Sequence, residues 1–239
     1  MTKLIAHRGA SLLALENTKK AFELAGASNK VYGIETDIWL TPDNVWVCTH
    51  DSNPFRNKTI HVNESKYSSF KKECLSIAKP KYLGNEQHYI CTFDEYLFIC
   101  KKYHKSPIIE IKQGNLSIQN IKELIDKIKK YNLFNKASFI SFELTSLELI
   151  KSLEPKALCF DLINVKCKFF SNRKAIKRSL RQKNNISVCY TMASRVTINN
   201  VHKQGLLISA WTIDNKRIAH KLVKRNLDFI TTNDINLLD

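Results

Sequence analysis

The chain has 239 residues, of which 44% are hydrophobic and 10% aromatic, and its 38 Lys and Arg against 22 Asp and Glu give a formal charge of +16. This content is enough for one large or two small packed domains, at about 100–200 residues per domain, and it excludes a disordered or coiled-coil protein. Only six Gly and five Pro are present, scattered singly, which excludes a collagen-like chain or a Gly/Ser linker.

Short β-branched runs alternate with amphipathic stretches along most of the chain. The predicted strands are, in chain order, Lys3–Arg8, Gly33–Trp39 with Val45–His50, Pro107–Lys112, Ala137–Phe142, Ala157–Leu162, Ile186–Tyr190, Leu206–Trp211 and Asp228–Thr231. The predicted helices are Asn17–Ala27, Thr92–Tyr103, Ser117–Tyr131, Ser146–Ser152, Arg173–Arg181, Ser194–Gln204 and Asn215–Arg225. Residues 52–91 are polar and too long for an ordinary connection, so we expect them to form an insertion.

Repeated strand-helix units predict a parallel sheet. Eight such units, with 33–50 counted as one, match an α/β fold of the (β/α)₈ TIM-barrel type better than an open sheet. No glycine-rich phosphate-binding motif follows any predicted strand, which counts against a nucleotide-binding sheet. We therefore expect a single barrel domain over 1–239, with a small insertion after the second strand unit.

Ionisable side chains gather where the predicted strands end, which is where the functional groups of such barrels lie. The polar strand ends carry His7-Arg8, Glu35 and Asp37, His50-Asp51, Glu110 and Lys112, Phe142-Glu143, Asp161 and Trp211. This set is more polar than strand interiors should be.

Glu35 and Asp37 are two residues apart in a predicted strand, so they point to the same side of it, with Cα atoms roughly 6.5–7 Å apart. Two adjacent carboxylates repel unless a positive group lies between them, and a hard cation with oxygen ligands is the natural choice. Glu110 is the candidate third ligand, and Lys112 adds a fixed positive charge. For an isolated Glu-x-Asp pair, outward-facing residues on a half-exposed strand are the more common explanation; three acids and a lysine at strand ends weaken it.

His7 and His50 each end a short apolar run. A lone histidine there is more often structural, but two beside a carboxylate pair indicate a general acid and a general base. Arg8 offers a two-pronged donor suited to a phosphoryl group. Together these residue types point to phosphodiester cleavage.

Several motifs follow one another in the order and spacing of a known family. They are His7-Arg8-Gly9-Ala10, Glu16-Asn17-Thr18, Ala21-Phe22, Gly33-Ile34-Glu35-Thr36-Asp37-Ile38, Leu40-Thr41-Pro42-Asp43, His50-Asp51, Glu110-Ile111-Lys112, Ile140-Ser141-Phe142 and Ala210-Trp211-Thr212. With these motifs the chain resembles the glycerophosphodiester phosphodiesterases over nearly its whole length. One departure is the end of the last strand, Thr231-Thr232-Asn233-Asp234 in place of T-D-x-P, which we expect to alter the last loop.

The resemblance implies a (β/α)₈ barrel that binds one divalent cation, Ca²⁺ or Mg²⁺, and hydrolyses glycerophosphodiesters to glycerol 3-phosphate and an alcohol through a cyclic phosphate. It leaves open which histidine acts first as the acid. The matching positions divide into metal ligands, an acid/base pair and substrate contacts, namely Glu35, Asp37 and Glu110; His7 and His50; and Arg8, Lys112 and Trp211.

Two alternatives stay open. Sphingomyelinase D-like phospholipases share the His, Glu-x-Asp and His arrangement, but they are typically secreted and disulfide-bonded. This chain has seven scattered cysteines, no apolar signal segment and no run of roughly 18–20 apolar residues, so we expect reduced thiols and a cytoplasmic location. The other alternative is a noncatalytic protein that binds polyanions or membranes.

The segment 166–183 bears on that second alternative, because it holds eight basic residues and no acid. It is either a patch that steers anionic phosphodiesters or touches lipid, or a solvated outer helix whose Ile176 and Leu180 face the barrel, which is the more common case. We attribute most of the remaining charge to composition. The expected partner is therefore a small phosphodiester and not nucleic acid, with peripheral membrane contact as a further hypothesis. The sequence does not indicate an oligomeric state.

Overall fold

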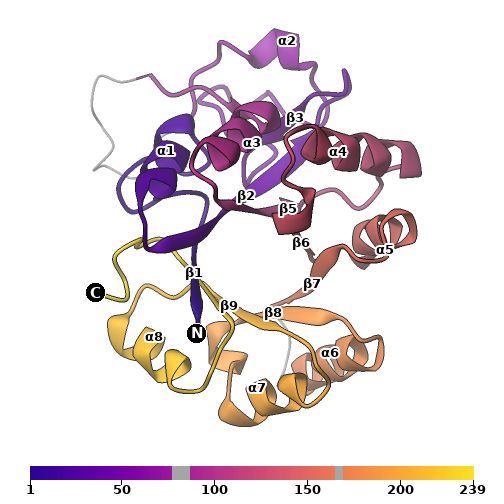
Figure 1. The fold of residues 1–239 in the computed structure, drawn as a ribbon. Helices are drawn as coiled ribbons and strands as arrows, with labels where there is room; N and C mark the ends of the chain where they lie inside the picture. The colour runs from indigo at the N-terminus through magenta and orange to yellow at the C-terminus, as the bar shows by residue number, and fades with distance from the viewer. Residues whose placement is uncertain (77–86, 165–168) are drawn as a thin grey trace.

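The computed structural model describes residues 1–76, 87–164 and 169–239. Eight parallel strands form a closed ring. They are β1 (Lys3–Ala6), β2 (Val31–Leu40), β5 (Ser106–Ile111), β6 (Ser138–Ser141), β7 (Leu158–Ile163), β8 (Asn185–Cys189), β9 (Ile208–Trp211) and β10 (Phe229–Thr232). The pairing runs β1-β10-β9-β8-β7-β6-β5-β2, and a further β1–β2 pairing closes the ring (Figure 1). The predicted (β/α)₈ barrel is confirmed.

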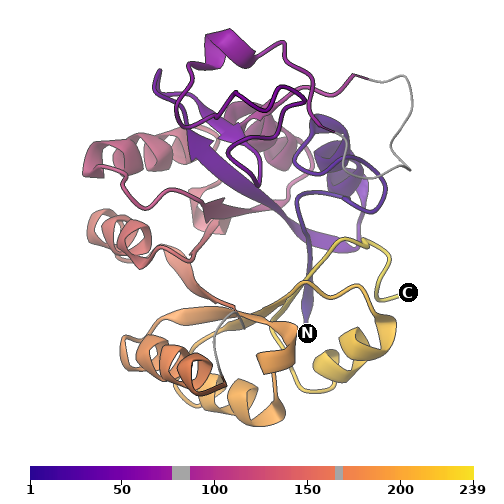
Figure 2. The ribbon, with the colours of Figure 1, turned by 180° about the vertical axis from the view of Figure 1, so that it is seen from behind.

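Helices surround this ring, as both ribbon views show (Figures 1 and 2). They are α1 (Lys19–Ala27), α3 (Phe93–Lys102), α4 (Ile118–Lys130), α5 (Leu144–Leu153), α6 (Phe169–Arg181), α7 (Arg195–His202) and α8 (Lys216–Val223). Each lies near its predicted position; α6 begins four residues before the predicted start at Arg173. Among the described residues, no helix has the length and apolar character needed to span a bilayer.

The segment predicted as a single irregular insertion is more ordered than expected. The predicted strand Val45–His50 is present as β3 (Trp46–Cys48), which pairs antiparallel with the end of β2. At the far end of the insertion, β4 (Cys91–Thr92) pairs antiparallel with β3, so both strands extend the sheet outside the ring. Between them lie α2 (Tyr67–Phe70) and an antiparallel bridge from Phe55 to Leu75. Both views place α2 and its flanking loops beyond α1 and α3, at one edge of the barrel (Figures 1 and 2). Residues 77–86 of the insertion lie outside the described residues.

The insertion packs against the barrel through a small apolar cluster. Phe55, Val62 and Phe70 of the insertion and Val47 of β3 are fully buried there, and the Phe55 and Phe70 rings lie 5.1 Å apart. Burying several large side chains at about 1.5–3 kcal/mol each supplies the free energy that holds these loops against the barrel. The insertion can therefore place polar side chains at the strand ends of the barrel.

The strand β2 shows how the sequence positions the site. Its residues alternate, so that Ile34 and Ile38 face outward into the main apolar core with the helices, while Glu35 and Asp37 point to the opposite side. The register with β5 places Asp37 directly beside Glu110. Adjacent parallel strands thus bring together acids 73 positions apart.

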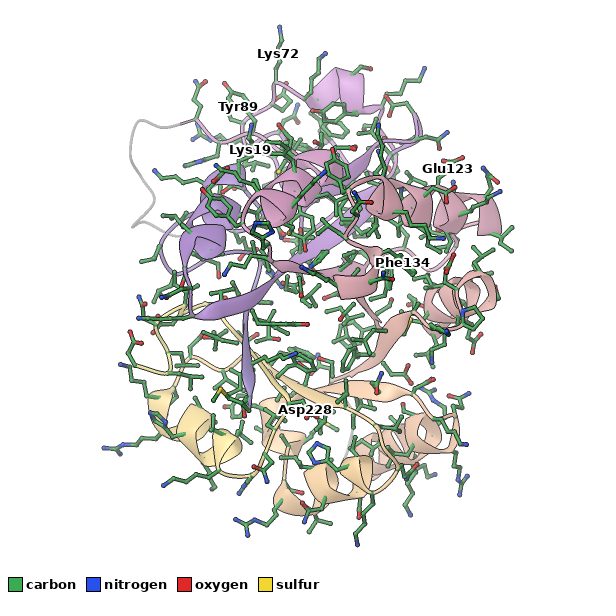
Figure 3. The ribbon with its side chains drawn as sticks, viewed as in Figure 1. Lys19, Lys72, Tyr89, Glu123, Phe134 and Asp228 are labelled. Carbon is green, nitrogen blue, oxygen red and sulfur yellow. The ribbon has the colours of Figure 1, made fainter. Side chains whose placement is uncertain are left out.

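The centre of the ring is packed and is not a channel. Side chains of Ile5, Ile108, Phe160 and Phe229 meet inside it, with the two phenylalanine rings 5.8 Å apart in an edge-to-face arrangement. Figure 3 shows side chains filling the gap that the ribbon alone leaves between the strands. This apolar floor lies beneath the polar strand ends.

Candidate active site

Three carboxylates from two neighbouring strands form the centre of the site. Glu35, Asp37 and Glu110 each offer an oxygen within 4.8 Å of those of the other two. Glu35 is 2% exposed and Asp37 is fully buried. The interpretation of Glu35 and Asp37 as outward-facing residues on a half-exposed strand is therefore wrong.

The electrostatics of this group are unfavourable without a cation. Burial, together with the Asp37 and Glu110 carboxylates, raises the pKa of Glu35 well above its usual range. Burial and the Asp37 charge raise the pKa of Glu110 to about 7. Burial also acts against the charge on Asp37, but Arg8 and Lys112 outweigh it and lower the pKa of Asp37. Asp37 is therefore the most acidic of the three.

Two basic side chains flank the acids. Arg8 Nε lies 3.1 Å from Asp37 Oδ2, and the Arg8 backbone N–H donates to Glu35 Oε2 at 2.8 Å. Lys112 Nζ lies 2.9 Å from Glu110 Oε1 and 3.4 Å from Asp37 Oδ1. Arg8 has a φ of 56°, which turns the chain sharply just after β1. Both basic groups thus border the carboxylates and the cavity.

The carboxylate cluster fits a hard divalent cation. Asp37 Oδ1 is buried and, among the described residues, has no hydrogen-bond donor. Its ion-pair partner Lys112 is at the long distance of 3.4 Å. Carboxylate oxygens are the ligands that Ca²⁺ and Mg²⁺ prefer, and a dication would offset the repulsion that raises the pKa values of Glu35 and Glu110.

The two predicted histidines lie at the same cavity but are held differently. Asn233 Nδ2 donates to Asp214 Oδ2 at 2.6 Å, so Asn233 Oδ1 is left to accept from His7 Nδ1–H at 2.9 Å. His50 Nδ1–H donates to Asp51 Oδ1 at 2.8 Å, because a carboxylate can only accept. In both rings Nε2 is therefore the nitrogen left for proton exchange. Burial and the Arg8 charge lower the pKa of His7.

A cavity of about 360 Å³ opens above the acids, among the ends of the strands. It is lined by His7, Arg8, Glu35, His50, Glu110, Lys112, Ile140, Phe142, Leu162, Asn164, Ser187, Trp211, Thr212 and Thr231. Seven of the eight predicted site residues are in this lining, and the eighth, Asp37, lies buried against Arg8 and Lys112. The Trp211 and Phe142 rings meet edge to face at 6.0 Å and form its aromatic wall.

Two of the polar strand ends lie elsewhere. Asp161 is buried and accepts from Asn184 Nδ2 at 3.2 Å, on the side facing α6 rather than the cavity. Glu143 stands at the start of α5, and its backbone N–H donates to Ser141 Oγ. Alternation along the strand places Asp161 opposite to the inward-facing Phe160 and Leu162, so its position near a strand end was not enough to put it in the site.

The basic segment 166–183 is partly described. Lys166 and Lys168 lie outside the described residues. In α6, Ile176 and Leu180 pack against the barrel core, as the outer-helix interpretation predicts. The exposed basic residues of α6 lie on its solvent side and not in the cavity lining.

Two asparagines of the site were not predicted to have a role. Asn17 Nδ2 donates to Asp37 Oδ2 at 3.0 Å, and Asn17 Oδ1 accepts from the Thr36 hydroxyl at 2.8 Å. Asn17 is buried with a φ of 55°, a conformation that asparagine tolerates better than most residues. Asn233 orients His7, and its position in the unusual Thr232-Asn233-Asp234 sequence was the available signal.

Comparison with known proteins gives one consistent family. The model of the "Glycerophosphoryl diester phosphodiesterase family" matches residues 7–237. The protein YhdW of Bacillus subtilis (strain 168) is 31% identical over 235 residues, covering 96% of this chain and 93% of YhdW. A glycerophosphodiester phosphodiesterase of Caldanaerobacter subterraneus subsp. tengcongensis is 29% identical over 254 residues, covering 98% of this chain and 94% of its own.

Solved structures show the same fold. A phosphodiesterase of Oleispira antarctica, in complex with the product sn-glycerol-3-phosphate, superposes with a TM-score of 0.81 at 21% identity, covering 98% of this chain and 93% of its own. A glycerophosphodiester phosphodiesterase of Agrobacterium tumefaciens str. C58 superposes with a TM-score of 0.79 at 18% identity, covering 99% of this chain and 98% of its own.

Proposed function

This chain belongs to the glycerophosphoryl diester phosphodiesterase family, and from that membership we propose that it hydrolyses glycerophosphodiesters to glycerol 3-phosphate and an alcohol, using a divalent cation and two histidines. The observation that carries the proposal is the arrangement of one cavity: three clustered carboxylates, two flanking cations and two imidazoles. The product in the Oleispira antarctica structure has the glycerol and phosphate groups that such a cavity would bind.

Glu35, Asp37 and Glu110 are the residues that would hold the cation, whether Ca²⁺ or Mg²⁺. When bound, a divalent cation supplies positive charge that stabilises the nonbridging phosphate oxygens as negative charge develops on them. Because these three acids project from strands, the ligand oxygens are held on a rigid frame.

Arg8 and Lys112 would contact the same phosphate from the side of the cavity. Each is anchored on Asp37, so neither must be ordered when substrate binds. Trp211 and Phe142 would form the wall against which the carbon chain of the glycerol packs. Together they would orient the diester with its phosphorus beside both histidines.

The first step would be attack by the glycerol hydroxyl adjacent to the phosphate. Its oxygen forms a bond to phosphorus while the bond from phosphorus to the alcohol oxygen breaks. His7 Nε2 takes the hydroxyl proton, a role suited to an imidazole whose pKa is lowered by burial and Arg8. His50 Nε2 gives a proton to the departing alcohol oxygen, with its ring held by Asp51.

The second step would open the cyclic phosphate by the same groups in reverse. His50 Nε2 takes a proton from water as the water oxygen bonds to phosphorus, and His7 Nε2 returns its proton to the glycerol oxygen that leaves. The product is glycerol 3-phosphate, and both histidines regain their starting protonation states. No proton is gained or lost by the protein over the cycle.

The substrate class is tested by offering glycerophosphocholine and sphingomyelin in separate assays with Mg²⁺ or Ca²⁺. We expect release of choline and glycerol 3-phosphate from the first and no turnover of the second. Turnover of sphingomyelin alone would favour the sphingomyelinase D-like alternative. Turnover of neither, with a folded protein, would favour a noncatalytic binding protein.

A further inference from the structure

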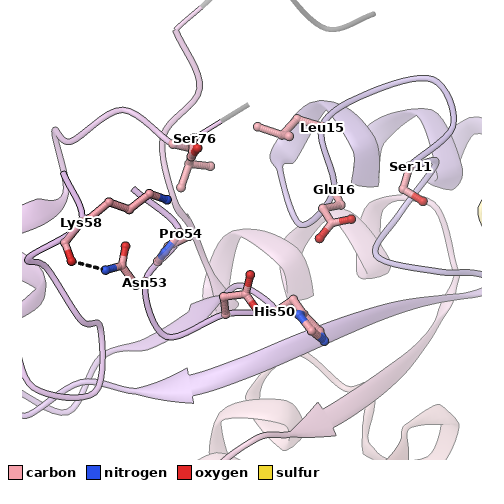
Figure 4. A pocket seen from close by; sticks show the side chains of 10 residues that line it. Ser11, Leu15, Glu16, His50, Asn53, Pro54, Lys58 and Ser76 are labelled. Carbon is pink, nitrogen blue, oxygen red and sulfur yellow. Dashed lines mark hydrogen bonds and ion pairs between the residues drawn. The ribbon is translucent and has the colours of Figure 1, made fainter. Parts of the chain in front are cut away.

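A second cavity of about 220 Å³ lies beside the first, between the loop after β1 and the insertion. Figure 4 shows Ser11, Leu15 and Glu16 on one side of it and Asn53, Pro54 and Lys58 on the other. Asp51, Leu75 and Ser76 complete its walls. The insertion therefore builds half of a site that the barrel alone would lack.

His50 belongs to the lining of both cavities. The first cavity holds the carboxylates, the phosphate-contacting cations and the aromatic wall, whereas the second contains none of these. A diester whose phosphorus lies in the first cavity has two substituents, of which the glycerol takes the aromatic side. The other substituent would extend past His50 into the second cavity.

The chemistry of the second cavity suits a small polar group. Leu15, Pro54 and Leu75 give it an apolar surface, while hydroxyl and charged side chains surround them. Glu16 and Asp51 contribute two carboxylates to the lining, while Lys58 and the His50 ring that donates the proton in the first step contribute two positive charges, so the formal charge is 2 − 2 = 0. Glu16 Oε1 also pairs with Arg8 at 2.8 Å, which links this wall to the phosphate-binding side. The two carboxylates can pair with an ammonium on the leaving alcohol, whereas Lys58 can pair with a carboxylate on it.

We propose that this second cavity binds the leaving alcohol, and that Glu16, Asp51 and Lys58 decide between an alcohol that carries an ammonium and one that carries a carboxylate. The inference rests on the proposed function and deepens it. It assigns a substrate-specificity role to the insertion, through Lys58 and Ser76, and it explains why His50 rather than His7 is the proton donor to the leaving oxygen: His50 stands between the phosphate and the alcohol.

The first test fills the cavity. Ser76→Phe should raise KM at least tenfold for glycerophosphoethanolamine but leave hydrolysis of glycerol 1,2-cyclic phosphate unchanged, because the cyclic phosphate has no leaving alcohol to seat. Ser68→Phe is the matched control, since Ser68 is exposed on α2 of the same insertion and does not line the cavity. It should change neither activity.

The second test changes the charge without filling the space. Lys58 is exposed, so Lys58→Glu should fold normally and should raise the ratio of kcat/KM for glycerophosphoethanolamine over glycerophosphoserine about threefold to fivefold, the range expected for a partly screened charge. Rates on the cyclic phosphate should not change.

The results of these experiments distinguish a failure of the alcohol site from a failure of the proposed function. If wild type cleaves both diesters but Ser76→Phe slows diester and cyclic phosphate equally, or slows neither, the second cavity is not the alcohol site. An unchanged ratio in Lys58→Glu would overturn the charge selection. If wild type cleaves no glycerophosphodiester, the proposed function itself fails.

Discussion

His7 is oriented by a chain of two side chains, Asn233 and then Asp214. The partner that accepts from its Nδ1–H is a neutral amide, which fixes the tautomer and raises the pKa of His7. Burial and the Arg8 charge outweigh this contact and lower the pKa of His7, which leaves Nε2 able to accept a proton. Asn233, which lies in the last-strand ending Thr231-Thr232-Asn233-Asp234, thus acts on the proposed base.

Replacing Asn233 tests this role by the pH profile. His7 must be neutral to accept a proton, so the acid limb of kcat/KM should lie below pH 6.5 in wild type. Asn233→Asp places a carboxylate on Nδ1, which raises the pKa of His7 and should move that limb up by about one pH unit. Asn233→Ala should lower kcat about tenfold with little change in KM. A merely structural role would leave the position of the acid limb unchanged.

The raised pKa of Glu110 predicts how the free energy of unfolding depends on pH. Its pKa is raised from 4.5 to about 7 by burial and by Asp37, so the folded protein binds this proton more tightly than the unfolded chain. With EDTA present, the contribution of Glu110 to the free energy of unfolding should be greatest below pH 4.5. It should be lost as the pH rises through about 7. A bound divalent cation should remove most of that loss.

Glu110→Gln supplies the control, because the neutral amide cannot acquire the buried charge. In EDTA at pH 8 we expect this variant to be more stable than wild type by about 1–3 kcal/mol in urea denaturation. With Ca²⁺ or Mg²⁺ added the order should reverse, since the variant lacks a ligand. A wild-type stability that does not change between pH 5 and 8 in EDTA would contradict the electrostatic description of the cluster.

The residues with charged functional groups could be predicted from the sequence, whereas their uncharged supports could not. Glu35 and Asp37 are recognisable because alternation puts both on one side of a strand. The pairing of His7 with Asn233 joins positions 226 apart, and it exists only because β1 and β10 are neighbours in the closed ring. Local pattern contains no information about such a contact.

Among the structural elements, the turn after β1 controls the position of Arg8. Gly9 has a φ of +82°, and a Cβ there would lie 2.7 Å from the Ala21 carbonyl carbon of α1. The loop therefore passes so close to α1 that only glycine fits. This contact fixes where Arg8 meets Glu35 and Asp37.

Gly9→Ala should accordingly cost about 2–4 kcal/mol of unfolding free energy, part from left-handed backbone strain and part from overpacking. Gly205→Ala is the matched control: Gly205 also has positive φ, +70°, but a Cβ there meets nothing within 4 Å. Strain alone should cost it about 1 kcal/mol. If urea denaturation shows the same loss of unfolding free energy in both variants, the close approach of the loop to α1 does not contribute to stability.

Element type and order could be predicted from the sequence, but the extent of the insertion's structure could not. The helix Ser117–Tyr131 was recognisable from its apolar stripe, and α4 spans Ile118–Lys130. β3 lies within the predicted strand Val45–His50, whereas β4 is only two residues long, too short to show alternation, and its pairing with β3 requires the two ends of the insertion to meet. His50 was expected to end a strand but follows β3 in a turn, at the boundary between the two cavities.

Few of the described basic side chains that give the chain its charge of +16 line the first cavity. Arg8 and Lys112 contact the carboxylates, whereas Lys174, Lys177 and Arg178 are exposed on the outer helix α6. Salt at physiological concentration screens the electrostatic effect of an exposed charge over about 8–10 Å. The positive charge of α6 therefore lies outside the cavity lining.

Replacing Lys174, Lys177 and Arg178 of α6 together by Glu should leave kcat/KM for glycerophosphoethanolamine within about threefold of wild type at 0.15 M salt. The dependence of kcat/KM on salt concentration should also be close to that of wild type. Arg8→Gln should by contrast lower kcat/KM by about 100-fold or more, because the phosphate loses a direct contact. A large loss in the α6 variant, absent at high salt, would instead establish the steering patch.

The proposed diester cleavage requires three carboxylates that bind a cation and two histidines that move protons. The most direct measurement is glycerol 3-phosphate formation from glycerophosphoethanolamine by wild type and by His7→Ala, each with Mg²⁺ or Ca²⁺ and with EDTA. The mechanism predicts cation-dependent turnover by wild type, loss in EDTA with recovery on adding the cation back, and a fall of at least about 100-fold in His7→Ala. Turnover that is insensitive to both EDTA and the substitution would contradict it.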